Sequence, residues 1–252
     1  MIHYNKFGEG NTVVLLHGFC ENSTCFSKQV FFLQQHFQVI TPDLPGFGNS
    51  EPIENTSIEK MADEVKYILE KENISSCVML GHSMGGYVAL AFAKKYVHLL
   101  TGFGLIHSTA YADSDERKLK RDQAIKVIEE KGAELYVQNF IPPLFSNSFT
   151  DNKIIDELIV EAKRSTSKGL IESLRAMKTR EDCTKLLQQT ALPVLFCVGK
   201  NDTIIPEKDM FYQASLCKQS QIAYLQHSAH MGYIEEAEKC AEAIIDFAKS
   251  IF

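Results

Sequence analysis

The chain has 252 residues, of which 45% are hydrophobic and 23% are charged, and its formal net charge is -6 at pH 7. This length and composition predict one globular core with room for an insertion. The negative charge, with no long run of lysine or arginine, argues against nucleic acid or an anionic membrane as a partner. No stretch of about eighteen apolar residues could span a bilayer, and the first residues are too polar for a signal peptide. We therefore expect a cytoplasmic protein.

Short apolar runs alternate with helical patterns along the chain, which is typical of a mostly parallel sheet covered by helices on both faces. At the N-terminus, residues 2–7 and a turn at residues 8–11 predict a hairpin with the first buried strand, and hence an antiparallel edge. The predicted buried strands lie at residues 13–16, 39–40, 78–80, 103–106, 194–198 and 222–225. The predicted fold class is therefore α/β.

Helical patterns fill most gaps between these strands. Residues 58–69 carry an apolar stripe at helical spacing, and Thr56 with Glu59 predicts a capping box in front of it. Residues 235–252 are interpreted as the last helix that covers the sheet.

The alternation of strand and helix patterns stops between residues 106 and 193. This stretch contains charged helical patterns and no convincing strand. We predict a core domain of residues 1–108 and 190–252, and a helical cap (lid) of residues 109–189. Because the stretch has no linker-like run of serine and glycine, we expect the cap to pack against the core.

Seven cysteines are scattered along the chain, and none forms a C-x-x-C pair, so no metal site is expected. Cys77 and Cys197 fall in apolar runs and are expected in the core, where free cysteine is common. Cys20 follows a predicted active-site loop. We interpret it as a small neutral wall residue and not as a second nucleophile, because no activating base is adjacent in sequence.

Residues 81–85 have the pattern G-x-S-x-G, directly after an apolar run and directly before an alanine-rich helical segment. A serine at such a strand-to-helix turn can be held in a strained conformation, with its hydroxyl above the sheet. The pattern therefore predicts Ser83 as a nucleophile. Because a serine hydroxyl is a poor nucleophile at neutral pH, it needs a histidine base that is oriented by a carboxylate.

Asp202 and His230 are the predicted acid and base. Each follows a predicted buried strand, so both should lie with Ser83 at the carboxyl edge of the sheet. The chain order serine, aspartate, histidine is the order expected after a nucleophile elbow. Two alternatives remain open. Asp202 could simply initiate a turn with Asn201 and have no catalytic role. His227 could be the base or a surface residue.

Attack on a carbonyl group creates an oxyanion, which needs two N–H donors. We predict the backbone N–H groups of Met84, directly after the nucleophile, and of Phe19, in the loop after the first buried strand. Gly18 would let that loop turn closely. His17 and His82 are interpreted as residues that brace or pack these loops and not as bases.

These motifs resemble those of the α/β-hydrolase family over nearly the full length of the chain. The resemblance rests on residues 16–19, 43–50, 81–85, 199–202 and 229–230, which follow the family's order. It implies a mostly parallel central sheet flanked by helices, with a helical cap inserted after the sixth strand. The chain departs from the pattern in two places: it lacks the family's additional first strand, and Cys20 stands where glycine is frequent. The second departure leaves the shape of the oxyanion loop open.

The resemblance also implies an activity. Ser83 excludes haloalkane dehalogenases and epoxide hydrolases, which carry aspartate in the elbow. Residues 174–182 resemble a segment of small-ester hydrolases, enol-lactonases and cofactor-free haloperoxidase-like members. We therefore expect a serine hydrolase that cleaves a small, mostly apolar carboxylic ester or lactone through an acyl-enzyme, without metal or organic cofactor.

Substrate choice is assigned to the cap. The candidate pocket residues are His107, Phe140, Ile141, Leu144 and Phe145, together with nearby Tyr136. For His107, a structural role with satisfied hydrogen bonds is the favoured alternative. The apolar cap residues could equally join cap to core. The same triad also serves C–C bond hydrolases and acyltransferases, and some proteins of this fold are ligand receptors or signalling partners. A small molecule is the expected partner, and the sequence allows a monomer or a homodimer.

Overall fold

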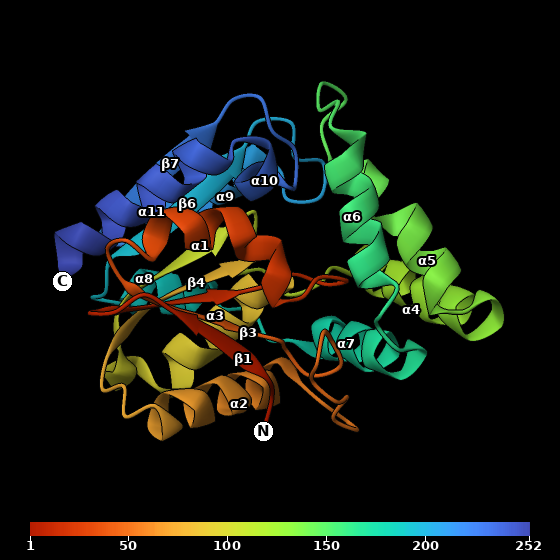
Figure 1. The fold of residues 1–252 in the computed structure, drawn as a ribbon, viewed down its shortest axis with the longest axis horizontal. Coiled ribbons are helices and arrows are strands. Elements are labelled where there is room, and N and C mark those ends of the chain that lie inside the picture. The colour runs from red at the N-terminus through yellow and green to blue at the C-terminus, as the bar shows by residue number, and fades with distance from the viewer.

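A seven-stranded sheet organises the whole molecule (Figure 1). The computed structural model describes all 252 residues. The strands are β1 (Tyr4–Phe7), β2 (Thr12–Leu16), β3 (Gln38–Pro42), β4 (Cys77–His82), β5 (Leu100–Ile106), β6 (Val194–Gly199) and β7 (Ser220–Leu225). Their order across the sheet is β1-β3-β2-β4-β5-β6-β7, and all neighbours are parallel except β1 with β3. The predicted α/β class with a mostly parallel sheet is confirmed.

The predicted N-terminal hairpin is wrong in its pairing, although the antiparallel edge is present. β1 does not pair with β2, which follows it in the chain, but with β3, so that Tyr4 lies opposite Pro42 and Phe7 opposite Val39. The reason is burial. All five residues of β2 are buried, and β2 pairs on both sides with parallel strands, whereas β1 is partly exposed and suits the outer position.

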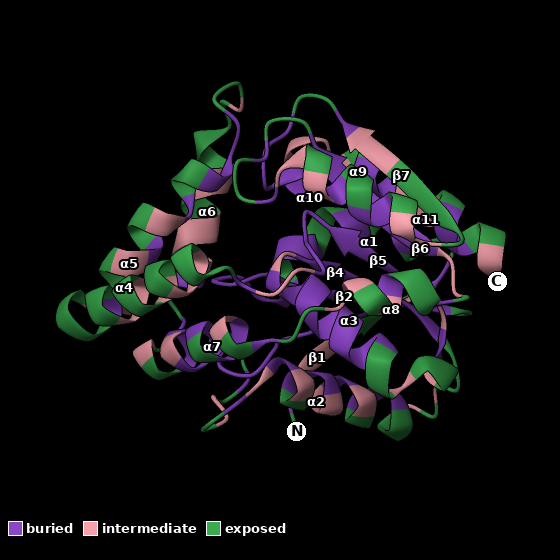
Figure 2. Cartoon of the chain, turned by 180° about the vertical axis from the view of Figure 1, so that it is seen from behind, coloured by how far each residue is buried: buried purple, intermediate pink, exposed green.

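Helices cover both faces of the sheet. On one face α1 (Ser27–Leu33) packs against α11 (Ala237–Ile251), and on the other α2 (Ile58–Lys71) packs against α3 (Met84–Lys95) (Figure 1). Residues 84–93 of α3 are all buried, as the purple ribbon shows (Figure 2). The remaining core helices are α9 (Glu207–Leu216) and α10 (Gly232–Glu235). None of the helices is both long and apolar enough to cross a membrane.

The N-terminal cap of α2 differs by one residue from the predicted capping box. Ser57 is the capping residue, and its hydroxyl accepts the backbone N–H of Lys60. Thr56 is buried instead, and its hydroxyl makes no hydrogen bond to the helix end.

Five helices and no strand lie between β5 and β6. They are α4 (Asp115–Lys131), α5 (Ala133–Phe140), α6 (Asn152–Ala162), α7 (Ser167–Thr179) and α8 (Thr184–Gln189), with the short 3-10 turn η3 (Pro142–Leu144) after α5. Helices α4 to α7 form a group at one side of the sheet in both views, whereas α8 lies against α9 of the core (Figures 1 and 2). The insertion follows the fifth of seven strands, because the family's additional first strand has no counterpart in this sheet.

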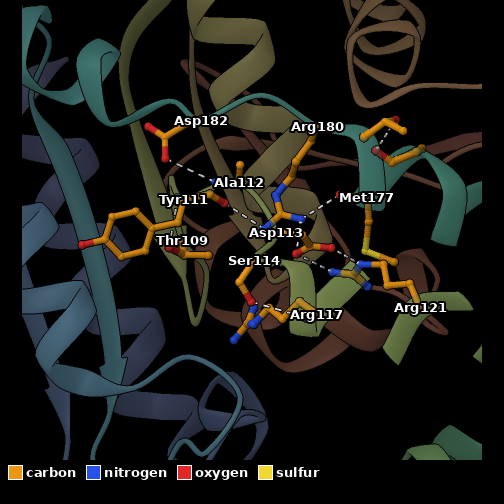
Figure 3. Close-up of polar contacts among 12 residues, drawn as sticks. Thr109, Tyr111, Ala112, Asp113, Ser114, Arg117, Arg121, Met177, Arg180 and Asp182 are labelled. Carbon is orange, nitrogen blue, oxygen red and sulfur yellow. Dashed lines mark hydrogen bonds and ion pairs between the residues drawn. The ribbon is translucent and has the colours of Figure 1, made fainter. Parts of the chain in front are cut away.

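The two segments that join the insertion to the core are held together by a buried ion cluster (Figure 3). Arg180 donates to the Tyr111 carbonyl oxygen (2.8 Å) and to the Asp113 carboxylate (2.6 Å), and its guanidinium lies 3.9 Å from the ring centroid of Tyr87 in α3. Arg121 of α4 donates to the same carboxylate. Although burial opposes ionisation of Asp113, Arg121 and Arg180 hold its pKa below the usual value. The cluster therefore fixes both ends of the insertion to the core.

Two glycines bring α7 into contact with the core loop after β3. A Cβ atom on Gly169 would lie 2.3 Å from the carbonyl oxygen of Gly46, and a Cβ on Gly46 would lie 2.6 Å from the Cα of Gly169. Gly46 also has a φ of 89°, which residues with side chains rarely adopt. This approach of backbone to backbone requires glycine on both sides.

Replacing Gly169 with alanine should therefore destabilise the fold. The new methyl group cannot fit against the Gly46 carbonyl group unless α7 moves, and such overpacking costs about 1–3 kcal/mol. Urea unfolding measures the change. Lys168→Ala, at the exposed neighbouring position, is the control and should change the free energy of unfolding by less than about 0.5 kcal/mol. An unchanged midpoint of urea unfolding for Gly169→Ala would show that α7 can move away from the Gly46 loop without destabilising the fold.

Candidate active site

Ser83 occupies the sharp turn between β4 and α3. Its φ of 49° and ψ of -113° are rare for a residue with a side chain. Glycines make the turn possible: a Cβ on Gly81 would lie 2.1 Å from the Gly85 carbonyl oxygen, and a Cβ on Gly85 would lie 2.1 Å from that of Leu16. The Ser108 hydroxyl donates to the Ser83 carbonyl oxygen (2.7 Å) and anchors the turn. Ser83 remains partly exposed at the carboxyl edge of the sheet.

Ser83, His230 and Asp202 meet at this edge, although the insertion separates Ser83 from the other two in sequence. Ser83 Oγ lies 3.0 Å from His230 Nε2, and His230 Nδ1 lies 2.8 Å from Asp202 Oδ2. An ionised carboxylate can only accept hydrogen bonds, so Nδ1 of His230 carries the proton. Nε2 is then free to accept the proton of Ser83.

Asp202 is held by four donors. Its Oδ1 accepts the backbone N–H groups of Ile204 (2.8 Å) and Ile205 (2.9 Å), and its Oδ2 faces His230 and, at 3.3 Å, Nδ1 of His107. Burial opposes ionisation, but electrostatic attraction to His230 and the hydrogen bonds from both imidazoles hold the pKa of Asp202 well below its usual range. The turn predicted as the alternative role of Asp202 therefore exists, and it supports the contact with His230.

His107 does not line a pocket, which corrects the sequence-based prediction. It has no accessible surface, and its ring fills the space beside two glycines, where a Cβ on Gly199 or Gly232 would lie 2.7 or 2.3 Å from its atoms. Burial lowers the pKa of His107 to about 4, so the ring is neutral near pH 7 and donates to Asp202. His227, the alternative base, is exposed, and only its backbone N–H has a partner, Glu236.

The backbone N–H groups of Phe19 and Met84 have no acceptor from regular structure. Met84 is the first residue of α3, where a helix cannot satisfy its own N–H groups, and the N–H of Phe19 has no acceptor in the protein. Cys20 has a φ of 65°, the left-handed conformation that glycine adopts most readily. Cys20 keeps this conformation while buried, and burial raises the pKa of its thiol, so it remains protonated.

His17 braces the loop that carries Phe19, as predicted. Its Nε2 accepts the backbone N–H of Leu44 (2.8 Å), and its Nδ1 contacts the Gly18 carbonyl oxygen (2.8 Å). Burial lowers the pKa of His17, which keeps the ring neutral and able to accept this bond.

Aromatic side chains of the insertion lie beside the same loop. The ring centroid of Phe140 is 5.5 Å from that of Phe19, and Tyr136 lies 6.2 Å from Phe19 and stacks on Phe140 at 5.5 Å. Phe140 and Tyr136 are only half-buried, so they are accessible beside the predicted oxyanion donors.

The other three candidate residues of the insertion are buried. Leu144 reaches the site through its main chain, because its carbonyl oxygen accepts the backbone N–H of His230 (3.0 Å). Ile141 is 1% exposed, and Phe145 stacks on Phe149 at 4.9 Å. Sequence patterns could not reveal the contact of Leu144, because a carbonyl oxygen is present at every residue.

The cysteines and acidic residues provide no metal site. Cys77 and Cys197 are completely buried, as predicted. No group of three histidine, cysteine, aspartate or glutamate side chains is arranged to hold a metal ion.

Comparisons with known proteins identify relatives of this fold. Residues 11–124 match the family model described as alpha/beta hydrolase fold. The solved structure of a thermophilic esterase from Thermogutta terrifontis is 31% identical, with a TM-score of 0.95 over 99% of this chain and 93% of that chain. A pimeloyl-[acyl-carrier protein] methyl ester esterase of Vibrio cholerae is 24% identical, over 98% of both chains. The 3-oxoadipate enol-lactonase 1 of Acinetobacter baylyi is 26% identical, over 90% of this chain and 84% of its own.

Replacing Asp202 with asparagine should make stability less sensitive to acid. The pKa of Asp202 is low in the folded state and about 3.9 in an unfolded chain, so its ionised form stabilises the fold above that value. This contribution is lost as the pH falls through and below about 4. Urea titrations between pH 5 and pH 3 give the free energy of unfolding as a function of pH. As the pH falls, this free energy should decrease more steeply for the wild type than for Asp202→Asn, by up to about 1.4 kcal/mol per pH unit.

Asp246→Asn provides the matched control, because Asp246 is an exposed aspartate on α11. Its slope should equal that of the wild type. Equal slopes for wild type and Asp202→Asn would show that the Asp202 carboxylate does not stabilise the fold.

Proposed function

The chain belongs to the α/β-hydrolase family and is an ester-bond hydrolase, and from this premise we propose that Ser83, His230 and Asp202 form its catalytic triad. One observation carries the proposal: a continuous hydrogen-bond chain runs from Ser83 Oγ through His230 to Asp202 Oδ2. The strained turn at Ser83 and the two neighbouring N–H groups of Phe19 and Met84 support it.

The mechanism follows from the donors and acceptors of these groups. His230 Nε2 takes the proton from Ser83 Oγ while the oxygen attacks the carbonyl carbon of the ester, and ionised Asp202 stabilises the imidazolium that forms. The N–H groups of Phe19 and Met84 hold the oxyanion of the tetrahedral intermediate. The imidazolium then protonates the leaving alcohol, and water releases the acyl group from Ser83 by the same steps.

The proposed substrate is a small, mostly apolar carboxylic ester or lactone. Phe19, Tyr136 and Phe140 provide an aromatic wall beside the oxyanion donors, and an acyl chain can pack against the faces of their rings. The methyl ester esterase and the enol-lactonase are named for substrates of these two bond types, which supports the same class for this chain. In this proposal residues 109–189 act as the lid that selects the substrate.

Replacing Ser83 with alanine should abolish ester hydrolysis and leave the fold intact. The variant lacks the attacking oxygen, so turnover of p-nitrophenyl butyrate should fall by at least about 10³-fold. A fluorophosphonate probe should label the wild type and not the variant. Ser250→Ala, at an exposed serine on α11, should retain activity and labelling. Full activity of Ser83→Ala, with unchanged circular dichroism, would overturn the triad.

Replacing Phe140 with alanine should weaken the preference for longer acyl chains. Butyrate has two more methylene groups than acetate, and each buried methylene contributes about 0.8 kcal/mol. The ratio of kcat/KM for the p-nitrophenyl esters of butyrate and acetate should therefore fall about 3- to 10-fold. Leu135→Ala, an exposed position on the same helix, should leave the ratio unchanged. An unchanged ratio for Phe140→Ala would show that Phe140 only packs against Phe19.

A further inference from the structure

A glutamate and a histidine form a buried pair beside the proposed triad, and the mechanism above uses neither. Nδ1 of His82 lies 3.0 Å from both carboxylate oxygens of Glu21, and each side chain is 1% exposed. His82 directly precedes Ser83 in the chain, and its ring centroid lies 5.1 Å from that of His230. The pair therefore lies between the loops that carry the proposed catalytic groups.

The partners of His82 determine its charge. Nδ1 faces the Glu21 carboxylate, and Nε2 lies 2.9 Å from the backbone carbonyl oxygen of His230. A carboxylate and a carbonyl oxygen only accept hydrogen bonds, so both ring nitrogens of His82 must carry protons to satisfy them. His82 is then an imidazolium cation, and Glu21 is its counter-ion.

The same pair holds the loop with the oxyanion donor. Glu21 Oε2 accepts the backbone N–H of Gly18 at 2.7 Å. A Cβ on Gly18 would lie 2.7 Å from His82 Nδ1, so the loop packs directly on the pair. Glu21 binds the N–H of Gly18, and the next N–H along the loop, that of Phe19, has no acceptor in the protein.

We propose that Glu21 and His82 are positioning residues. As a charged pair, they hold the Phe19 N–H and the His230 loop in the correct position relative to Ser83. The inference rests on the proposed triad. Each loop has its own attachment: Gly18 to the carboxylate, His230 to the imidazolium, and Ser83 to His82 through the chain. The oxyanion and the His230 imidazolium form only during reaction, so a shift of these loops weakens transition-state binding more than substrate binding.

The surroundings favour the charged state of the pair. The other titratable side chains that face it are His17, Cys20, Cys25, His107, Asp202, His230 and Tyr233. Burial raises the pKa of the Cys25 thiol and the Tyr233 hydroxyl, which keeps both neutral. Burial also disfavours charge on the pair, but each partner offsets it, so the pKa of His82 is raised and that of Glu21 is lowered.

Two substitutions test the contributions of Glu21 and His82 separately. Glu21→Gln keeps the shape but removes the charge, and His82→Asn keeps a donor for Glu21 but is too short to reach the His230 carbonyl oxygen. Each should lower kcat for p-nitrophenyl butyrate roughly 10- to 100-fold, less than the full loss of an oxyanion donor, with KM changed less than about threefold. Since the residues act as a unit, the double variant should be no slower than the slower single variant.

A matched control separates positioning from stability. Leu69→Ala removes a completely buried side chain on α2, outside the loops that carry the proposed catalytic groups, and should lower the melting temperature while leaving kcat unchanged. If Glu21→Gln lowers stability but leaves kcat within twofold of the wild type, or if the effects of the two substitutions multiply in the double variant, the positioning role is overturned.

Nuclear magnetic resonance of ¹⁵N-labelled histidine provides a readout that does not depend on activity. In the wild type at pH 8, one histidine should have both ring nitrogens protonated, and its signals should be absent from His82→Asn. In Glu21→Gln, Nδ1 should lose its proton. The protonated form is present below the raised pKa of His82 and is lost as the pH rises through it, so kcat of the wild type should decline there. A neutral His82 at pH 8 would overturn the pair.

The outcomes distinguish the two proposals. If Ser83→Ala retains full activity, the triad fails, whereas the NMR signals still report the charge of His82. If Ser83→Ala is inactive but Glu21→Gln and His82→Asn match the wild type in kcat, the triad stands and the positioning role fails.

Discussion

The strained backbone of Ser83 is the constraint on which the rest of the site depends. A residue with a side chain at a φ of 49° costs about 1–3 kcal/mol, and the turn persists only because its surroundings leave no alternative. β4 is buried along all six residues, and α3 is buried over residues 84–93, so neither element can shift to relax the turn. The missing side chains of Gly81 and Gly85 provide the space. The Ser83 hydroxyl is therefore fixed before any partner arrives.

The insertion is joined to the loop that carries His230 by main-chain contacts as well as by side chains. The carbonyl oxygen of Leu144 accepts the N–H of His230, and the Glu235 carboxylate accepts the N–H groups of both Ser146 and Ala229. The loop that carries His230 thus shares its hydrogen bonds with the insertion. A displacement of η3 would break bonds of this loop, so the position of the insertion and the geometry of His230 are energetically coupled.

The site residues that can be predicted from the sequence are those whose local sequence pattern indicates their structural environment. Ser83 lies in a pentapeptide between a strand and a helix, and Asp202 and His230 each follow an apolar run, so their place at the sheet edge could be predicted. His107 also follows an apolar run, which predicts its place at the sheet edge but not whether its ring faces a pocket or the core. Glu21 carries no local pattern, and its partner His82 is distant in sequence, so the sequence does not predict their contact. The N-terminal hairpin failed for the same reason, because pairing with β3 is decided by the burial of β2 and not by the intervening turn.

Two of the buried carboxylate–histidine pairs in the site, Asp202 with His230 and Glu21 with His82, differ in what the second ring nitrogen contacts. Nε2 of His230 faces the Ser83 hydroxyl, which can give up a proton, whereas Nε2 of His82 faces a carbonyl oxygen, which has none to give. The first arrangement allows a neutral ring that gains and loses a proton, and the second requires a ring that stays protonated. A carboxylate and an imidazole therefore produce a mobile charge at His230 and a fixed one at His82, because the partner of the second ring nitrogen differs.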